Sequence, residues 1–239
     1  MEKGICTQSA IAIRKEHSHT SEMVSQLLYN ELYTKLDEVN GWTLIRTELD
    51  QYEGWIWTKQ HHAISEEEFE RLKASKVFIV NKPITHLEGK WLSFGTPLYE
   101  PHADAAAMPA TFNPELMIEN AKKLLDVPYL WGGRTLMGID CSGFVQVCAR
   151  SAGLLLPRDA SQQVKCGEPV YFLQETLPGD LAFFGDEDGR ITHVGILIGN
   201  EQIIHASGKV RIDYLDQTGI FNKVKNAHTH HLQTIMRLE

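Results

Sequence analysis

The sequence predicts an α+β protein in which a small β-barrel precedes a domain whose helices come before its strands. Two observations lead to this prediction. Residues 1–62 contain short segments in which apolar and polar residues alternate, separated by turn residues, a pattern typical of small barrels. From residue 113 onward, two segments with helical periodicity precede a series of apolar strands. That order predicts an α+β domain with a mainly antiparallel sheet.

The composition excludes several classes of protein. The chain has 239 residues, of which 43% are hydrophobic and 23% are charged, as in ordinary globular proteins. Its net charge of -8 and the lack of any Lys/Arg cluster argue against a nucleic-acid partner. A small cationic or zwitterionic ligand remains compatible with this charge.

Targeting signals and cysteine spacing bear on the compartment. The sequence shows no apolar run of signal-peptide length near its start and no stretch of about 18 apolar residues. We therefore expect a cytoplasmic protein with no membrane partner; if a leader has been removed, a periplasmic or secreted protein is the alternative. Cys6, Cys141, Cys148 and Cys166 show no spacing of the disulfide or zinc type, so we expect free thiols in a reducing compartment.

The first barrel is expected to contain four recognisable strands. The turn Glu38-Val-Asn-Gly41 joins two of them through residues that tolerate positive φ. The expected strands are residues 9–14, 31–36, 42–46 and 54–57.

Residues 63–100 allow two interpretations. Ser65, followed by acidic residues, predicts a short helix, and residues 76–80 and 91–94 have the character of two further strands. The segment is either a degenerate second barrel or an elaboration of the first. The predicted domains are residues 1–62, 63–100 and 113–239, with an Ala-rich, Pro-bounded linker at residues 101–112.

Cys141 stands where a reactive thiol is expected. Residues 113–125 predict an amphipathic helix with Asn at its N-cap and Pro at its first position. A second helix is expected from Cys141 to Ala152, with Gly153 ending it. The unpaired N–H groups of a first helical turn favour thiolate over thiol and lower the cysteine pKa from about 8.5. We therefore predict that Cys141 is a nucleophile.

A hairpin downstream supplies two histidines. Residues 192–198 and 202–206 are apolar strands joined across Gly199-Asn200, a strong turn dipeptide. If the hairpin closes there, His193 and His205 are near-opposite neighbours, and the register decides whether they share a face. His193 would then accept the thiol proton, and His205 would hold the other ring nitrogen.

Other cysteines and histidines are predicted to be inert. Cys148 and Cys166 are expected to be small buried hydrophobic residues. His228, His230 and His231 lack nearby Cys or carboxylate ligands at helical or finger spacing, so no metal is predicted. Nor does any motif call for a cofactor.

Five motifs of the second domain occur in a recognisable order. They are Asp140-Cys-Ser-Gly-Phe144, Leu156-Pro-Arg-Asp-Ala-Ser-Gln-Gln163, Pro178-Gly-Asp-Leu-Ala-Phe-Phe184, His193-Val-Gly-Ile196 and Ile204-His-Ala-Ser207. Over residues 113–238 this order resembles the NlpC-type cysteine peptidases, which implies a compact papain-like fold and cleavage of peptidoglycan stem peptides. The resemblance implies that Cys141 is the nucleophile, His193 the base and His205 the orienting residue. It also implies that Tyr129 contributes to the oxyanion hole with the Cys141 backbone N–H.

The first domain carries a resemblance of its own. The segments that carry it are Ala12-Ile-Arg14, Ser21-Glu-Met-Val-Ser-Gln-Leu27, Asn40-Gly-Trp42 and Asp50-Gln-Tyr-Glu-Gly-Trp-Ile56. In this order they resemble bacterial domains of the Src-homology-3 (SH3) type, which often accompany cell-wall enzymes. The fold class implied is α+β, with an SH3-like β-barrel followed by a papain-like catalytic domain.

The fusion of the two domains resembles the γ-D-glutamyl-L-diamino acid endopeptidases. In that group the barrel closes one end of the cleft and restricts substrates to peptides with a free N-terminal L-Ala. Asp140 would then bind the free ammonium and Arg158 the α-carboxylate of γ-linked D-Glu. Trp131 would be a cleft wall. The other substrate-binding residues expected from the motifs are Ser142, Asp159 and Ser161.

Tyr52 and Glu53 of the barrel are candidates for the wall that closes the cleft. An aromatic and an acid in a surface hairpin turn are an equally good interpretation of these two residues.

The expected reaction is hydrolysis of the bond between γ-D-Glu and the L-diamino acid, diaminopimelate or Lys, in small murein peptides. The product would be L-Ala-γ-D-Glu, and the role would be recycling of cell-wall peptides by a monomer. An amidase or acyltransferase with the same Cys/His/His triad is one alternative. A non-catalytic cell-wall binding protein is the other.

Overall fold

A computed structural model describes residues 1–238, and the chain divides into two compact units. Unit 1 comprises residues 1–108 and 130–138, and unit 2 comprises residues 109–129 and the chain from residue 139 onward. The sequence analysis placed residues 130–138 in the second domain, whereas the structure assigns them to unit 1. Among the described residues, no helix combines the length and the apolar character needed to cross a bilayer.

The first sheet of unit 1 is antiparallel and has the strand order β3-β2-β6-β5-β4-β1-β7. Its strands are β1 (Lys3–Ile5), β2 (Ala10–Arg14), β3 (Met23–Leu28), β4 (Leu32–Val39), β5 (Trp42–Thr47), β6 (Glu53–Trp57) and β7 (Ala63–Ile64). Asn40 and Gly41 both have positive φ between β4 and β5, which confirms the predicted turn. The strands β1, β3 and β7 were not predicted.

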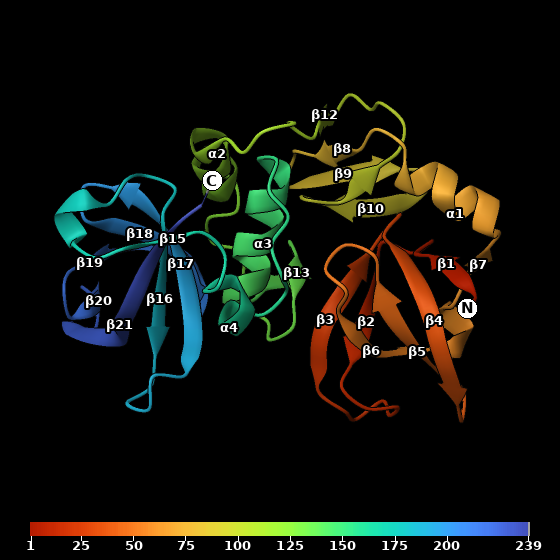
Figure 1. Cartoon of the computed structure of the whole chain (residues 1–239), viewed down its shortest axis with the longest axis horizontal. Coiled ribbons are helices and arrows are strands. Elements are labelled where there is room, and N and C mark those ends of the chain that lie inside the picture. The colour runs from red at the N-terminus through yellow and green to blue at the C-terminus, as the bar shows by residue number, and fades with distance from the viewer. Residues whose placement is uncertain (239) are drawn as a thin grey trace. The chain divides into compact units, whose positions relative to one another are not determined.

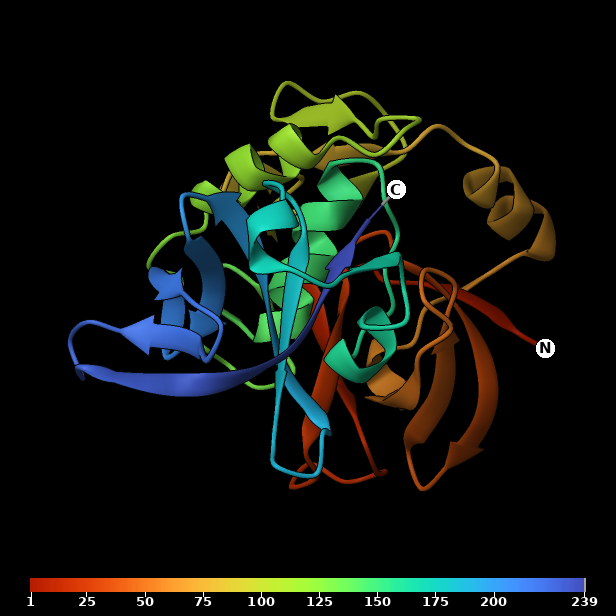
Figure 2. The ribbon, with the colours of Figure 1, turned by 60° about the vertical axis from the view of Figure 1, so that its left-hand side comes forward.

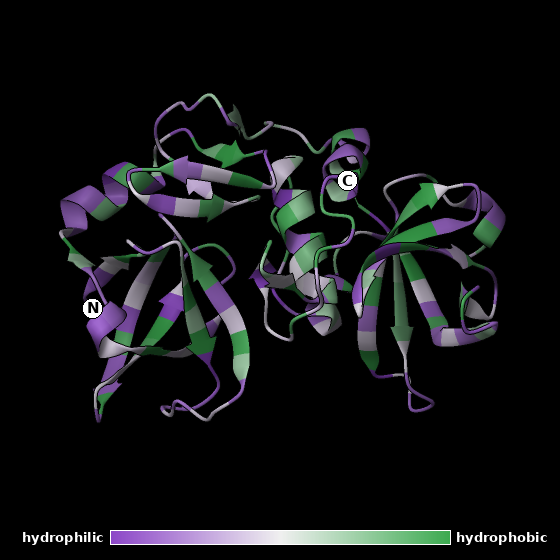
Figure 3. Ribbon diagram, turned by 180° about the vertical axis from the view of Figure 1, so that it is seen from behind, coloured by the Kyte–Doolittle hydropathy of each residue, from purple (hydrophilic) through white to green (hydrophobic). Residues whose placement is uncertain are grey.

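Alternation along these strands places one apolar face in the interior of unit 1. The core includes Ile11, Ile13, Leu27, Ile45 and Ile56, all almost completely buried. Figure 3 shows the resulting change between hydrophobic and hydrophilic residues along the strands. A period of two with one buried face also fixes the pairing register, because a slip of one residue would expose this core.

Residues 63–107 form a helix and two small sheets rather than a closed second barrel. The helix α1 (Glu66–Lys73) begins after Ser65, whose side chain accepts from the Glu68 N–H, as predicted. A short 3-10 helix (Thr58–Gln60) precedes this segment. The strands are β8 (Phe78–Val80), β9 (Ile84–Leu87), β10 (Lys90–Ser93), β11 (Pro97–Leu98) and β12 (Ala105–Ala107).

The sheets of this segment pack against the first barrel. Tyr29 of the barrel lies against the cluster of Val80, Leu92 and Leu98, which favours an elaboration of the first barrel over a second one. The predicted linker is also partly strand, because β12 pairs with β8. The Ala-rich composition of residues 101–112 suggested a linker, but the backbone N–H and C=O groups of β8 pair with this segment.

Over the residues that the structure describes, unit 2 contains three α-helices and a sheet that closes on itself. The sheet order is β15-β21-β16-β17-β18-β19-β20, and β20 also pairs with β21, so that β16 to β21 form a closed barrel (Figure 1). Its strands are β15 (Glu168–Val170), β16 (Leu181–Gly185), β17 (Ile191–Gly199), β18 (Gln202–Ser207), β19 (Lys209–Leu215), β20 (Gly219–Asn222) and β21 (Ala227–Arg237). The long β21, dark blue in Figure 2, pairs with β15, β16 and β20.

The helices of unit 2 are α2 (Pro114–Lys122), α3 (Cys141–Ser151) and α4 (Ala160–Gln163), with a 3-10 helix at Leu173–Glu175. Asn113 caps α2, with Pro114 at its first position, as predicted. Every residue of α3 is buried. Cys148 is one of them, which confirms its predicted place in the core, whereas Cys166 is partly exposed and that prediction was wrong.

Candidate active site

Cys141 is the first residue of α3, as predicted. Asp140 occupies the N-cap position, and its Oδ1 accepts from the Gly143 N–H at 2.7 Å. The Cys141 side chain is buried, with 5% of the residue exposed. Its sulfur accepts hydrogen bonds from the backbone of Val194 and of Ser142, so the thiol lies against β17 at the residue that follows His193 in the chain.

The pKa of this thiol is raised, and the predicted lowering was wrong. Burial is the main cause, and the Asp140 carboxylate adds to it; together they raise the Cys141 pKa to about 11. The hydrogen bonds from Val194 and Ser142 and the nearby Arg158 act in the opposite direction. The loss of hydration of the thiolate therefore raises the Cys141 pKa by more than the N-terminus of α3 lowers it.

The histidine hairpin is present, with its turn one residue later than predicted. Asn200 and Glu201 both have positive φ, and Gly195 pairs with His205. A bulge follows, because Gly199 pairs with Gln202. The paired residue numbers therefore sum to 400 before the bulge, one more than a turn centred on Gly199-Asn200 would give.

In this register His193 and His205 are diagonal neighbours on one face of the sheet. His193 Nε2 lies 2.8 Å from His205 Nδ1, and both side chains are buried. The structure thus brings together the two histidines that the sequence paired.

Asp213 of β19 extends this line, and the sequence analysis missed it. Its Oδ2 lies 3.2 Å from His205 Nε2, and its Oδ1 accepts from Arg211 at 2.9 Å. Asp213 follows a short apolar segment without a motif of its own. Only the register of β18 with β19, which the sequence does not reveal, could have indicated its position.

His230 was predicted to be inert and instead contacts His193, the predicted base. Its ring stacks on that of His193, with 4.2 Å between the centroids and 25° between the planes. Burial, together with His205 and His230, holds the pKa of His193 well below its usual value. Burial is also the main cause that lowers the pKa of His230 to about 4. Both imidazoles are therefore neutral near pH 7.

A hollow of about 310 Å³ opens beside His193. It is lined by Tyr129, Thr192, His193, Ala206, Ser207, Gly208 and His230. Burial raises the Tyr129 pKa to about 12, and the neighbouring Cys141 and Asp140 add to the shift. The phenol therefore keeps its proton near pH 7 and can donate it in a hydrogen bond to an oxyanion.

Asp140 and Arg158, which the sequence analysis assigned to two different substrate charges, bind each other. Arg158 donates to both carboxylate oxygens of Asp140, at 3.0 and 2.5 Å. It also donates to Ser142 Oγ at 2.9 Å, and the Arg158 side chain is 1% exposed. This buried pair fixes the start of α3, and the predicted contacts of these three residues with substrate stay predictions.

The remaining predicted substrate residues are distributed over both units. In unit 2, Asp159 is the N-cap of α4 and Ser161 is exposed within it. In unit 1, Trp131 is 55% exposed and donates to Glu22 at 2.7 Å.

Tyr52 and Glu53 also belong to unit 1. Tyr52 is partly buried, and Glu53 pairs with Arg46 at 2.6 Å. Their predicted roles in substrate binding are open to experiment.

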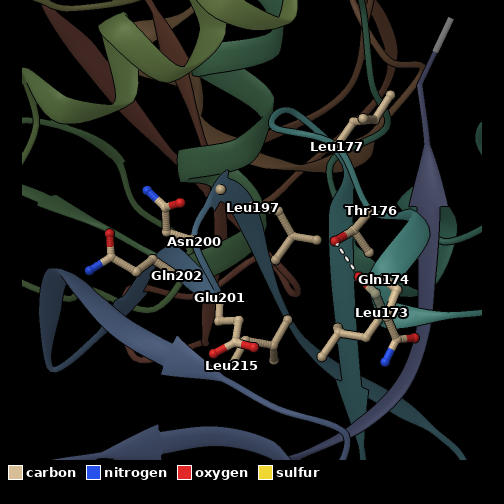
Figure 4. Close-up of a pocket in the computed structure, with 10 residues that line it drawn as sticks. Leu173, Gln174, Thr176, Leu177, Leu197, Asn200, Glu201, Gln202 and Leu215 are labelled. Atoms are coloured by element: carbon tan, nitrogen blue, oxygen red, sulfur yellow. Dashed lines mark hydrogen bonds between the residues drawn. The ribbon is translucent and has the colours of Figure 1, made fainter.

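Unit 2 has a second hollow, of about 250 Å³, that contains none of this chemistry (Figure 4). Leu173, Leu197 and Leu215 line it together with polar residues of the β17–β18 turn. Two of the lining residues are hydrogen-bonded to each other, because Thr176 Oγ1 donates to the Leu173 carbonyl at 2.7 Å. Neither Cys141 nor either of the paired histidines contributes to this hollow.

Two segments of the chain match known families. Residues 126–229 match the NlpC/P60 family, and residues 13–60 match the bacterial dipeptidyl-peptidase SH3 domain. An NlpC/P60 family protein from Bacillus cereus has the same fold, with a TM-score of 0.81 at 20% identity over 98% of this chain and 99% of that one. An NlpC/P60 endopeptidase from Photobacterium damselae gives a TM-score of 0.72 at 16% identity, covering 97% of this chain and 70% of that one.

Three curated relatives share part of the sequence. The γ-D-glutamyl-L-lysine dipeptidyl-peptidase of Bacillus subtilis is 40% identical over 38% of this chain and 31% of its own. The γ-DL-glutamyl hydrolase of the same organism is 42% identical over 47% and 28%. The probable endopeptidase NlpC of Escherichia coli is 49% identical over 34% and 53%. The matched segments thus span between about a quarter and a half of these relatives.

Proposed function

Because the chain carries an NlpC/P60 domain and a bacterial dipeptidyl-peptidase SH3 domain, we propose that it is a cysteine peptidase acting on murein peptides. The bond cleaved is that between γ-D-Glu and the L-diamino acid. The observation that carries this proposal is the buried, hydrogen-bonded pair of His193 and His205, together with a buried Cys141 thiol that accepts from the backbone of Val194, the residue after His193. A nucleophile, a base and an orienting group are the set that acyl transfer through a thioester needs.

The first half of the reaction uses the proton of the thiol. His193 removes the proton from Cys141 while the sulfur attacks the γ-carbonyl carbon, which forms a C–S bond and a tetrahedral oxyanion. The phenol of Tyr129 and the Cys141 backbone N–H donate to that oxyanion. As the C–N bond breaks, the imidazolium of His193 protonates the leaving amine, and an acyl-enzyme thioester remains.

Water completes the turnover. His193, neutral again, takes a proton from a water molecule, whose oxygen attacks the thioester carbon. The C–S bond breaks, the γ-carboxyl group of D-Glu is released, and the sulfur recovers its proton from the imidazolium. The raised pKa of Cys141 and the lowered pKa of His193 mean that this pair is neutral before substrate binds. Proton transfer therefore accompanies the attack rather than preceding it.

The substrate is proposed from the names of the relatives and from the two domains. Two of the relatives are named for a γ-glutamyl bond, which supports γ-D-Glu on the acyl side. We extend this to tripeptides with a free N-terminal L-Ala and with diaminopimelate or Lys as the leaving amino acid. The product would be L-Ala-γ-D-Glu, in the recycling of wall peptides within the cytoplasm.

The direct test is incubation of the reduced protein with L-Ala-γ-D-Glu-meso-diaminopimelate, followed by mass spectrometry. We expect L-Ala-γ-D-Glu to appear, and Cys141→Ala to slow its formation by at least about a thousandfold while the fold is retained. No dipeptide from the wild-type protein would refute the substrate. Full activity of Cys141→Ala would refute the nucleophile.

Three comparison substrates set the limits of specificity. The N-acetylated form of the tripeptide tests whether a free amine is required, and we expect it to be cleaved much more slowly than the free-amine tripeptide. Poly-γ-glutamate tests the specificity named for the second relative. Intact murein tests an endopeptidase that needs no free N-terminus, and faster cleavage of murein than of the tripeptide would favour that function.

A further inference from the structure

The hydrogen-bonded line through the histidines continues beyond His205 and ends at a charged pair. We propose that Asp213 is a positioning residue of this site, which fixes the tautomer of His205 and thereby the ring nitrogen that His193 presents to Cys141. This inference rests on the proposed function, and it assigns a role to a side chain that does not touch the substrate.

The geometry of three neighbouring strands builds this line. His193 on β17, His205 on β18 and Asp213 on β19 are each diagonal neighbours of the next, because Gly195 pairs with His205 and Ile203 pairs with Asp213. The links measure 2.8 Å between the imidazoles and 3.2 Å from His205 Nε2 to the carboxylate. His205 is fully buried, and Asp213 is 6% exposed.

The far end of the line is neutralised by an arginine. Arg211 lies two residues before Asp213 on β19, with 2.7 Å between its Nε and the carboxylate Oδ2. Its side chain is 25% exposed, so the charged end of the line reaches solvent while the histidines do not. An isolated buried carboxylate would be unfavourable, and this ion pair allows it to stay charged.

The direction of each hydrogen bond follows from what each group can donate. An ionised carboxylate only accepts, so Asp213 requires the proton of His205 to be on Nε2. A neutral imidazole carries a single N–H, so His205 Nδ1 is left as an acceptor, and His193 must donate to it from Nε2. Neutral His193 therefore has its lone pair on Nδ1, the nitrogen left free to receive the thiol proton.

Loss of the carboxylate would remove this bias. His205 could then carry its proton on Nδ1 and donate to His193 Nε2. In that arrangement His193 would hold its own proton on Nδ1 and could not act as a base. The fraction of molecules in the productive tautomer, and hence kcat, would fall.

The charges around the line agree with this assignment. Burial raises the pKa of Asp213, but the hydrogen bonds from His205 and Arg211 outweigh burial, so that the pKa is lowered overall. The pKa of His205 is lowered by burial, with Asp213 acting against burial and Arg211 acting with it. The other titratable side chains whose rings face the His205 ring are His193 on β17 and His230 on β21. Asp213 is therefore ionised and both linked imidazoles are neutral near pH 7.

Asp213→Asn tests the proposal, because it keeps the size of the side chain and removes the charge. We expect kcat on the tripeptide to fall about 10- to 100-fold, by analogy with the loss of carboxylate partners of metal-bound histidines, with KM within about twofold. The acid limb of the plot of kcat against pH should move to lower pH, because the variant lacks the carboxylate that favours the protonated imidazolium form of the histidines.

Two further variants separate positioning from packing. Arg211→Gln removes a cation that disfavours imidazolium, so the acid limb should move to higher pH, opposite to Asp213→Asn. Ile212→Ala changes an exposed side chain on the other face of β19 and should leave kcat and the profile unchanged. A loss of kcat in Asp213→Asn that is equal at every pH, with a lower midpoint of urea unfolding, would overturn the proposal in favour of packing.

The tautomers of His193 and His205 can also be determined by NMR in the absence of substrate. Nitrogen-15 shifts of the histidines at pH 7.5 should show His193 and His205 protonated on Nε2 in the wild-type protein, and a mixture for His205 in Asp213→Asn. A wild-type His205 protonated on Nδ1 would overturn the inference. If instead the tautomers are as expected but no peptide is cleaved, the proposed function fails and the assignment of Asp213 stands.

Discussion

Cys141 shows how two opposing effects are balanced at one residue. The first turn of α3 offers its sulfur the Ser142 N–H, and β17 offers that of Val194. Burial and the adjacent Asp140 nevertheless raise the pKa to about 11. The cost of moving a thiolate out of water thus exceeds the stabilisation that two backbone dipoles supply. The free protein keeps a protonated thiol.

This balance predicts the pH dependence of alkylation. In a Cys166→Ser background, which removes the partly exposed thiol, iodoacetamide should modify Cys141 slowly at pH 7. The rate should rise about tenfold per pH unit toward pH 11, because only the thiolate reacts. In urea the same thiol should level off near pH 9, since an unfolded cysteine has a pKa of about 8.5. A native rate constant that is flat between pH 6 and pH 9 would contradict the raised pKa.

At the residue scale, the sequence showed those site residues that lie on a motif or next to a turn. Cys141 follows a capping Asp140, and His193 and His205 flank a Gly-Asn turn. Asp213 and His230 could not be predicted, because they reach the site through the pairing of β18 with β19 and through closure of the barrel by β21. Pairing across several strands is a tertiary property with no local signal.

The β17–β18 hairpin is the element on which the histidine pair depends. Gly195 stands opposite His205. A methyl group placed at Gly195 would lie 2.8 Å from His205 Cβ and 2.7 Å from Ile203 Cδ1, closer than real Cβ contacts. The lack of a side chain at this position allows β17 and β18 to approach closely enough for the imidazoles to bond. The sequence analysis placed the hairpin but not its register.

Gly195→Ala should therefore separate the two strands. We expect a loss of about 1–3 kcal/mol in the free energy of urea unfolding, as for other overpacked cores, and a fall in kcat as the bond between the imidazoles lengthens. The double variant Gly195→Ala/Ile203→Val removes the closest of the three contacts shorter than 3.0 Å, that with Ile203 Cδ1. It should recover part of the stability while kcat stays low. Wild-type kcat in Gly195→Ala would show that the hairpin tolerates the change.

At the scale of the whole molecule, the chain leaves unit 2 after Tyr129 and re-enters it at Ile139, two residues before Cys141. The segment between them folds as part of unit 1. Arg134 forms a buried, bidentate ion pair with Glu31, with distances of 2.9 and 3.0 Å. It also donates to the Gln26 carbonyl at 2.7 Å. The Leu136 N–H donates to Ser93 Oγ at 3.0 Å.

The sequence places this segment in the second domain because it lies between the helix expected at residues 113–125 and the helix expected from Cys141. The partner of Arg134 lies 103 residues away, and nothing in the local sequence pairs the two. The separate domains were predictable from their strand and helix patterns. The exchange of a segment between them was not, because it depends on long-range contacts with Gln26, Glu31 and Ser93.

This arrangement predicts that unit 1 supports catalysis by holding a segment that flanks Cys141, the proposed nucleophile. Glu31→Gln leaves the guanidinium of Arg134 buried without its counter-charge, and the loss of one partner of a buried pair costs about 3–5 kcal/mol. We expect residues 130–138 to detach from unit 1, which should appear as faster hydrogen exchange in this segment. A drop in kcat/KM should accompany it, because Tyr129 and Cys141 adjoin the segment.

The matched control is Glu38→Gln, which removes one partner of an exposed pair with Lys35 at 2.7 Å. Such surface pairs contribute less than about 1 kcal/mol, so exchange in residues 130–138 and kcat/KM should both stay at wild-type values. If Glu31→Gln accelerates exchange without changing kcat/KM, the active site does not depend on the anchoring of this segment. If neither quantity changes, the buried pair does not hold the segment. The expected result, a change in both for Glu31→Gln and in neither for Glu38→Gln, would make the buried pair a requirement for activity as well as for folding.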